Sequence, residues 1–343
     1  MKQGWKFTVG GLSLTAILLA GAIAQTNSWK NFKLRSVASA VLVSNRTQQT
    51  LEQTLGFEKR REDSANARIN LTELLSGGVG QDGIPSIDTP EFDTAETTPF
   101  ASEDVVIGVV INGEAKAYPF RVMDWHEIVN DTVGGINISV SYCPLCDTIV
   151  AFERGETTFG VSGKLYQSCL VMYDRADDTL YAQPWAAGIM GEKVNENLAR
   201  IPAVKTTLGS WLARHPESEI LSTRTGHSRN YAAYPYGTYY TDENILFPVR
   251  NQETRQLHPK AIVSYIWEAD GETPKNEFAG AHLQFVHEVL KEQAPQIVEL
   301  AGRSIRVRWD EHLETVIAEE MDGTVIPSST AFAFVYAAHF GDE

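Results

Sequence analysis

Alternating hydrophobic and polar residues predict several β-strands in this chain. From Ile136 to Tyr142, apolar side chains occupy every second position, which is the period of a strand with one buried face. The segments Val105 to Ile111 and Glu114 to Pro119 flank Asn112-Gly113, and this dipeptide is the strongest short sequence signal for a tight hairpin. Another strand is expected from Thr148 to Glu153. These segments predict antiparallel sheet.

Helical patterns are fewer. We expect a short helix from Arg121 to Asn130 and a second from Thr207 to His215, which Pro216 follows. Short strands fit Thr157 to Val161 and Leu170 to Tyr173. The expected fold class is therefore α+β: β-rich, with mostly antiparallel sheets in two packed and related halves.

A weak internal repeat suggests that the halves are related. A glycine turn and strand at residues 134–140 resemble residues 301–308, and residues 211–215 resemble residues 335–339. We therefore expect a first β-rich half at residues 81–225, a tyrosine-rich connector at 226–244 and a second half at 245–343. The second half is a degenerate copy that lacks cysteines.

The amino-terminal residues have the pattern of an export signal. Lys2 and Lys6 precede an uncharged, largely apolar run from Phe7 to Ala24. Residues 1–24 are expected to be a cleaved signal peptide or a retained membrane anchor, and thus the protein's sole contact with the membrane. Residues 25–80 are expected to be a tether, helical from Arg46 to Phe57. The remaining chain would be exported, in a periplasmic or other extracytoplasmic location.

Composition narrows the function classes. The 343 residues are 43% hydrophobic, which is enough for a core without disulfide support. Three cysteines exclude a disulfide-rich scaffold. With 29 basic and 44 acidic residues, the net charge of −15 argues against a nucleic-acid partner. The expected partner is a small molecule or another protein of the cell envelope.

The sharpest chemical feature is Cys143-Pro144-Leu145-Cys146, here called the CPLC motif. Two residues between the cysteines let both sulfurs face one point, which suits a disulfide or two ligands of one metal ion. A β-branched and aromatic segment follows, so the helix that activates the thiol of a thioredoxin-like site is expected to be missing. A structural disulfide, a metal site and a redox or nucleophilic thiol pair all remain open.

A second cluster of polar residues lies at residues 124–131. On a helix, His126 and Asn130 would share one face, and a tight turn would bring His126 near Cys143. His126 would then be a base or a third metal ligand, oriented by Glu127. Two thiolates and an imidazole suit cuprous copper, and zinc also fits. The alternative is a capped, partly buried histidine with no chemical role.

Three other features are candidate site residues. Cys169 could be a third ligand, a resolving thiol or a small buried hydrophobic residue. Asp174 and Arg175 form either a surface turn or a pair at the mouth of a pocket. Tyr236 stands in a segment with five tyrosines, which lines a ligand cleft or covers the contact between the halves. P-loop, nucleophile-elbow, zinc-protease and dinucleotide motifs are absent from the sequence.

The ordered set of motifs resembles one known family, the domain of unknown function 3179 (DUF3179), across roughly residues 80–343. The family comprises bacterial and archaeal proteins that are often exported. The resemblance implies a shared fold and a shared site built from the Trp-His-Glu and CPLC motifs, and it implies no activity. The motifs are Asp82-Gly83-Ile84-Pro85, Gly113 to Pro119, Trp125 to Asp131, Tyr142 to Cys146, Phe159 to Gly163, Met172 to Arg175 and Pro235-Tyr236-Gly237.

Three functional hypotheses follow. The first is an exported redox or metal-handling protein, because a chain with an ample core gains little from a disulfide that closes so short a loop. The second is a non-catalytic binding module with a structural Cys143–Cys146 disulfide. The third is a hydrolase or transferase that uses a Cys/His pair.

Overall fold

The computed structural model describes residues 66–252, 254, 257–269, 278 and 280–341. The predicted export segment and the predicted helix from Arg46 to Phe57 lie outside these residues. Residues 66–225 are called the first region below, residues 226–244 the connector, and residues 262–341 the second region.

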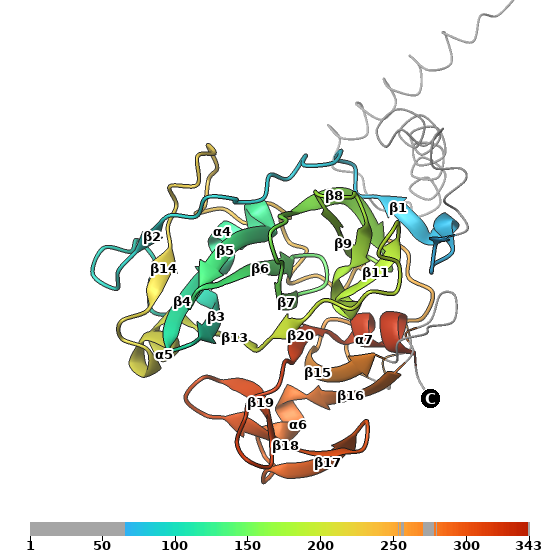
Figure 1. Ribbon diagram of the computed structural model, residues 1–343. Coiled ribbons are helices and arrows are strands. Elements are labelled where there is room, and N and C mark those ends of the chain that lie inside the picture. Colours follow the sequence, from blue (N-terminus) through green and yellow to red (C-terminus); the bar gives the residue numbers. More distant parts are fainter. Residues whose placement is uncertain (1–65, 253, 255–256, 270–277, 279, 342–343) are drawn as a thin grey trace, which may run out of the picture. The chain divides into compact units, whose positions relative to one another are not determined.

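The first region contains three sheets (Figure 1). One has the strand order β1 (Leu74–Ser76), β8 (Phe159–Tyr166), β9 (Cys169–Asp174), β10 (Leu180–Ala182) and β11 (Ala187–Met190). The next has the order β12 (Arg200–Ile201), β7 (Thr148–Glu153), β6 (Ile136–Cys143) and β5 (Ile128–Val133). The third has the order β13 (Ala203–Thr207), β3 (Val105–Ile111), β4 (Glu114–Pro119), β14 (Glu219–Leu221) and β2 (Phe92–Asp93).

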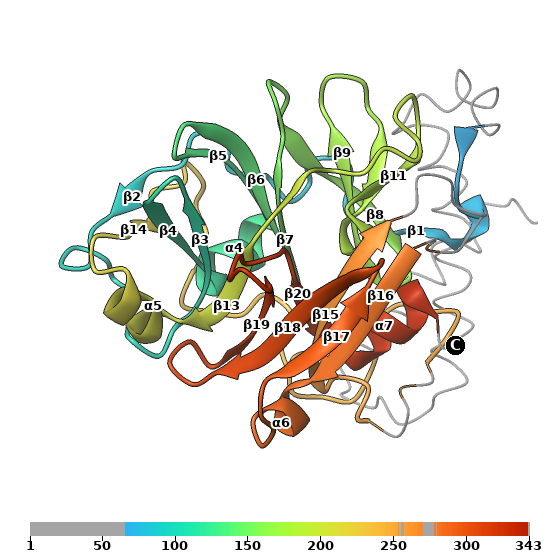
Figure 2. The same cartoon turned by 60° about the horizontal axis from the view of Figure 1, so that its bottom comes forward.

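The second region adds two three-stranded sheets, which are seen together in Figure 2. Their orders are β16 (Gly280–Val286), β15 (Ile262–Ala269), β20 (Ser329–Phe332), and β17 (Gln296–Leu300), β18 (Arg303–Asp310), β19 (Thr315–Glu320). Among the described strands, the pair of β4 and β14 is parallel and the other ladders are antiparallel. The predicted class, β-rich α+β with mostly antiparallel sheets, is confirmed.

The helices are short. They are α4 (Phe120–His126), α5 (Leu208–Arg214), α6 (His287–Leu290) and α7 (Ala333–Phe340), with 3-10 turns η2 (Leu71–Glu73) and η3 (Gln183–Trp185). No helix in the described part of the chain is long and apolar enough to cross a membrane.

Local sequence signals located the hairpins well, and the helix at residues 121–130 less well. The strands on both sides of Asn112-Gly113 and the strand from Thr148 have the expected bounds. The expected helix ends at His126, because Glu127 adopts a left-handed backbone conformation with φ +59°. The β-branched residues that follow enter β5, so Asn130 does not share a helical face with His126.

The sheet structure begins earlier than residue 81, the expected start of the first half. The amide of Arg68 donates a hydrogen bond of 2.9 Å to the carbonyl of Ile189. Strand β1 then pairs with β8, so residues 66–80 form part of the first region.

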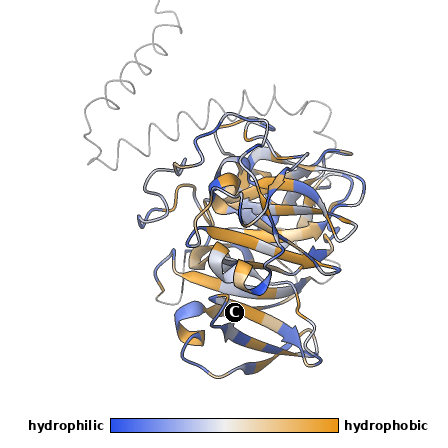
Figure 3. Cartoon of the chain, turned by 90° about the vertical axis from the view of Figure 1, so that its left-hand side faces the viewer, coloured by the Kyte–Doolittle hydropathy of each residue, from blue (hydrophilic) through white to orange (hydrophobic). Residues whose placement is uncertain are grey.

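Apolar side chains of the strands and helices form the core, and Figure 3 shows long hydrophobic stretches along several strands. One cluster packs β19 of the second region against β3, β4 and α5 of the first; its members include Val106, Trp211, Leu313 and Ile317. The two segments of the suggested repeat, in β6 and β18, are each the middle strand of a three-stranded antiparallel meander. The relationship between the halves stays a prediction.

Packing at Gly108 gives a test of the contact between β3 and α5. A Cβ atom at this position would lie 2.2 Å from a ring carbon of Trp211, which is itself buried. Because this core cannot accept the extra volume without a shift, we expect Gly108→Ala to lower the free energy of unfolding by about 1–3 kcal/mol. Urea unfolding measures the change. Gly77→Ala is the matched control, since its Cβ would meet its neighbours at 3.4 Å or more; equal midpoints for both variants would contradict the packing.

Candidate functional site

The CPLC motif forms the tip of the β6–β7 hairpin. Cys143 ends β6 and pairs with Thr148 at the start of β7. The loop between them is closed by a hydrogen bond of 3.2 Å from the Cys146 amide to the Cys143 carbonyl, and Asp147 has φ +53°. A strand follows the motif, as the sequence predicted, and so the helix that activates the thiol in thioredoxin-like sites is absent here. The tip is fully buried: Cys143 is 1% exposed, and Cys146 and Asp147 are 0% exposed.

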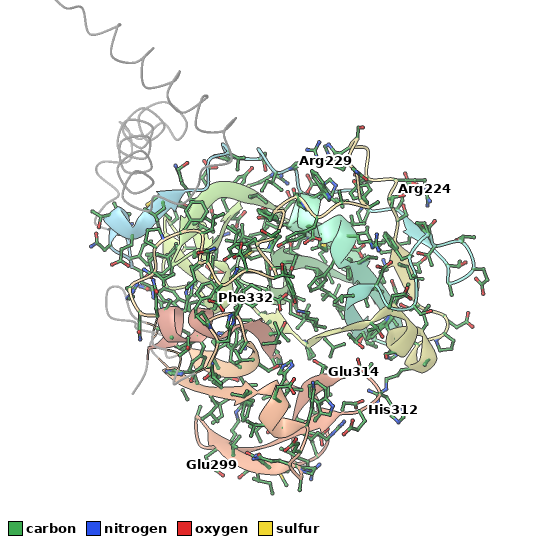
Figure 4. All side chains as sticks on the ribbon, turned by 180° about the vertical axis from the view of Figure 1, so that it is seen from behind. Arg224, Arg229, Glu299, His312, Glu314 and Phe332 are labelled. Atoms are coloured by element: carbon green, nitrogen blue, oxygen red, sulfur yellow. The ribbon has the colours of Figure 1, made fainter. Side chains whose placement is uncertain are left out.

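Partners from outside the first region hold this tip in place. The Phe332 amide donates to the Cys146 carbonyl at 2.9 Å, and the Tyr239 hydroxyl donates to the Leu145 carbonyl at 2.8 Å. The Ser329 hydroxyl donates to the carbonyl of Ile149 at 2.5 Å. Phe332, labelled in Figure 4, thus places β20 of the second region against the hairpin. A buried loop needs such donors, because its carbonyls have lost their hydration.

All three cysteines are free thiols in the structure. The thiol of Cys146 interacts with those of both Cys143 and Cys169. Burial raises the pKa of Cys143 and Cys146 well above 9, and that of Cys169 to about 11. The thiols are therefore protonated at neutral pH, and a neighbouring base is needed before any of them can react.

The carboxyl group of Glu127 interacts with Cys143 through its charge. Its charge contributes to the raised pKa of the Cys143 thiol. The carboxyl is buried and accepts a hydrogen bond of 2.9 Å from the Tyr236 hydroxyl. Burial raises its pKa to about 7, although the Tyr236 hydrogen bond acts in the opposite direction. Such a carboxyl can accept or return a proton near neutral pH.

Asp124 interacts with two other acidic groups, Asp147 and Glu127. Burial, and then the charges of Asp147 and Glu127, raise the pKa of Asp124 to about 8. Burial also raises the pKa of Asp147, but the ammonium of Lys205 at 2.5 Å opposes it. Burial lowers the pKa of Lys205, and Asp147 and Tyr240 outweigh this effect, so the net shift is upward. Lys205 therefore compensates the buried carboxylate of Asp147.

The hydrogen bonds of this cluster are incomplete. Within the described part of the chain, the buried Oδ1 atom of Asp124 and the buried hydroxyl of Tyr234 have no hydrogen-bond partner. The two groups are close enough to interact electrostatically. Buried polar atoms without partners are rare in folded proteins and concentrate where a ligand or a reaction uses them.

His126 does not join the thiols. One ring nitrogen, Nδ1, is 2.7 Å from the carbonyl of Pro85, and the other, Nε2, is 2.7 Å from the hydroxyl of Tyr231. Burial lowers the pKa of His126 to about 4, so the ring is neutral. A carbonyl only accepts, hence Nδ1 carries the proton and Nε2 accepts from Tyr231. Both nitrogens are engaged, which leaves neither a base nor a metal ligand for Cys143.

The expected metal set consists of Cys143, Cys146 and His126. No group of three or more His, Cys, Asp and Glu side chains among the described residues is arranged to hold a metal ion. Both ring nitrogens of His126, the expected third ligand of copper or zinc, contact Pro85 and Tyr231 in this structure. Metal binding and the Cys/His hydrolase pair stay predictions, and the carboxyl group of Glu127, expected to orient His126, accepts a hydrogen bond from Tyr236.

Asp174 and Arg175 form ion pairs with neighbouring loops. Asp174 is 1% exposed and pairs with Lys193 at 2.5 Å. The guanidinium of Arg175 binds Asp82 and Asp88, each at 2.9 Å. These contacts tie the loop that precedes β2 to the end of β9. Of the three residues suggested for substrate binding, Tyr236 alone contacts the site.

Several site residues could not be identified from local sequence. Asp124 lies in the motif that was singled out, but its raised pKa depends on residues distant in sequence. Lys205 interrupts a strand of otherwise uncharged residues, which is the one signal that marks it. The donors Tyr239 and Phe332 carry no signal, because the tertiary fold brings them to the hairpin.

The fold and site define a β-rich α+β protein with a buried dithiol at a hairpin tip, next to a cluster of carboxyl groups. The chain belongs to the DUF3179 family, whose description is "Protein of unknown function" and whose model matches residues 81–330. No curated protein and no solved structure matches the chain.

The raised pKa of Glu127 predicts a pH-dependent stability. Its pKa rises from 4.5 to about 7 on folding, so its contribution to stability is present below pH 4.5 and is lost as the pH rises through 7. Glu127→Gln keeps an acceptor for Tyr236 and removes the ionisation. We expect this variant to gain on the order of 3 kcal/mol relative to the wild type between pH 4 and pH 8.

Chemical denaturation at several pH values measures this gain. Glu103→Gln, at an exposed carboxyl, is the control and should follow the wild type at every pH. A constant difference between Glu127→Gln and the wild type would show that Glu127 is not buried as an acid.

Proposed function

We propose that this protein is an exported thiol–disulfide redox protein with Cys143 and Cys146 as its reactive pair. One observation carries the proposal: two thiols of one hairpin tip interact with each other, and the fold includes a buried carboxyl group, that of Glu127, whose pKa is about 7 and whose charge acts on Cys143. A structural disulfide would not need that carboxyl group, which destabilises the folded protein once it ionises.

The reaction transfers two electrons from the dithiol to a disulfide RSSR. Glu127 accepts the proton of Cys143, and the thiolate attacks one sulfur of RSSR. The Cys143–S–S–R bond forms and the first RSH leaves with a proton. The thiol of Cys146 then loses its proton and attacks the Cys143 sulfur, forming the Cys143–Cys146 disulfide and releasing the second RSH. The protein is oxidised, and RSSR is reduced.

The surroundings of the pair favour a small reactant. Each thiol is at most 1% exposed, and the connector contributes Tyr234, Tyr236 and Tyr239 around the tip. A folded protein substrate has no direct approach to sulfurs at this depth. We therefore assign a low-molecular-weight thiol or disulfide as the reactant, supplied from the extracytoplasmic medium.

Reduction of 2-hydroxyethyl disulfide by the pre-reduced full chain tests the proposal. We expect two equivalents of free thiol per chain, with alkylation and mass spectrometry placing the new bond between Cys143 and Cys146. Cys143→Ala and Cys146→Ala should each abolish formation of that bond, and Cys169→Ala should retain it. Circular dichroism checks that the variants fold. A reduced wild type that leaves the reagent unchanged would contradict the proposal.

Glu127 gives a separate kinetic prediction. If it is the proton acceptor, Glu127→Gln should slow the first step by about 10²-fold, since general-base catalysis contributes factors of this order. The wild-type rate should rise with pH through about 7, where Glu127 ionises, and the variant should lose this step. Stopped-flow measurement of the first step at several pH values tests this prediction. If Glu127→Gln has the same rate and the same pH dependence as the wild type, Glu127 is not part of the mechanism.

One observation favours a second function, the binding of a small molecule. A cleft of about 700 Å³ lies between the regions, and its lining includes Lys205, His287 and Trp309. Because Lys205 also pairs with Asp147, the cleft adjoins the dithiol site. This supports a binding module for a small molecule, tested by a thermal-shift screen repeated on Trp309→Ala. Hits that stabilise both variants equally would contradict it.

A further inference from the structure

Cys169 stands at the tip of a second hairpin, and its thiol interacts with that of Cys146 at the tip of the first. Cys169 begins β9 and pairs with Tyr166, the last residue of β8. The two residues between them, Gln167 and Ser168, have φ +50° and +62°. A two-residue turn with positive φ at both positions is usually built from Asn and Gly, so this backbone is costly and must be held by its surroundings.

The side chain of Gln167 supplies part of that support. Its amide donates to Glu73 at 2.5 Å, and its carbonyl oxygen accepts from the Arg250 amide at 2.7 Å. Ser168 and Cys169 are both 0% exposed. The turn therefore presents the Cys169 thiol at a fixed position in the interior instead of at the surface.

The two hairpin tips bring three thiols together. The Cys146 thiol interacts with Cys143 on its own hairpin and with Cys169 on the neighbouring one. The backbone amide of Leu170, next to Cys169, faces the Cys143 sulfur. The charge of Cys143 also raises the pKa of Cys169, and this electrostatic effect is the interaction found between the two thiols. Cys146 is thus the central sulfur of the three.

From this arrangement we infer that Cys169 is a third redox thiol and that Cys146 forms a disulfide with either Cys143 or Cys169. The inference rests on the proposed function of the Cys143–Cys146 pair. Cys169 would then be a resolving thiol. Its complete burial alone would suggest only a small hydrophobic residue of the core.

The exchange between the two disulfides balances without an outside reactant. The Cys169 thiolate attacks the Cys146 sulfur, the Cys146–Cys169 bond forms and the Cys143–Cys146 bond breaks. Cys143 leaves as a thiolate and takes up one proton, which balances the proton that Cys169 gave up. The number of disulfides is unchanged, so no net oxidation occurs.

The two disulfides would have different mechanical consequences. A Cys143–Cys146 bond lies within one hairpin loop and restricts little of the chain. A Cys146–Cys169 bond joins the β6–β7 loop of one sheet to β9 of another and closes a longer loop, so it restricts the unfolded chain more. The second disulfide should therefore raise the midpoint of thermal unfolding further than the first.

Disulfide mapping of cysteine variants tests the inference. The full-length wild type, Cys143→Ala, Cys146→Ala and Cys169→Ala are reduced, oxidised with diamide, quenched in acid, alkylated and mapped by mass spectrometry. We expect Cys143→Ala to form Cys146–Cys169, and Cys169→Ala to form Cys143–Cys146. The wild type should contain both bonds in different molecules, and Cys146→Ala should form neither. Cys143→Ser, closer in shape to cysteine, replaces Cys143→Ala if that variant does not fold.

The outcomes separate the two proposals. If Cys169→Ala and the wild type form Cys143–Cys146 while Cys143→Ala keeps both thiols free, the role of Cys169 is wrong and the proposed function stands. A Cys143–Cys169 bond in Cys146→Ala would show that Cys146 is not the central sulfur. If no variant forms any disulfide, the proposed function itself fails.

Discussion

The site depends on the burial of a polar hairpin tip. A loop of two thiols, a carboxylate and several carbonyl groups has been removed from water, and each group needs a protein partner to remain there. Lys205 supplies the countercharge for Asp147, Tyr239 a donor for the loop, and Phe332 of β20 a second donor. These partners come from the first region, the connector and the second region, so the site exists only when all three are folded together.

The same burial sets the chemistry. Removal from water favours neutral acids, which keeps the thiols protonated and brings the carboxyls of Asp124 and Glu127 into the neutral pH range. A protonated thiol is unreactive until a base accepts its proton, and in the proposed mechanism Glu127 is that base. The mechanism thus assigns to a buried carboxyl group the task that a helix dipole has in thioredoxin-like sites. The ring nitrogens of His126, the expected base, contact Pro85 and Tyr231.

The sequence predicted those features that depend on residues close together in the chain, and not those that depend on residues far apart. The hairpins around Asn112-Gly113 and the CPLC motif depend on neighbouring residues, and their bounds were predicted closely. The helix before Glu127 was extended too far, because a left-handed glutamate leaves no mark in the hydrophobic pattern. Contacts over long sequence separations, such as Lys205 with Asp147 and Tyr239 with Leu145, were not predictable from one sequence. The site's cysteines were thus found from their spacing, and its charges only from the fold.

An equilibrium titration of the full chain in glutathione buffers tests the central claim most directly. The fraction of the Cys143–Cys146 disulfide is measured by alkylation and mass spectrometry as the ratio of reduced to oxidised glutathione changes. A redox protein requires one reversible two-electron transition, reached equally from the reduced and the oxidised side. A disulfide that stays closed in fully reducing buffer, or thiols that stay free in fully oxidising buffer, would contradict the account.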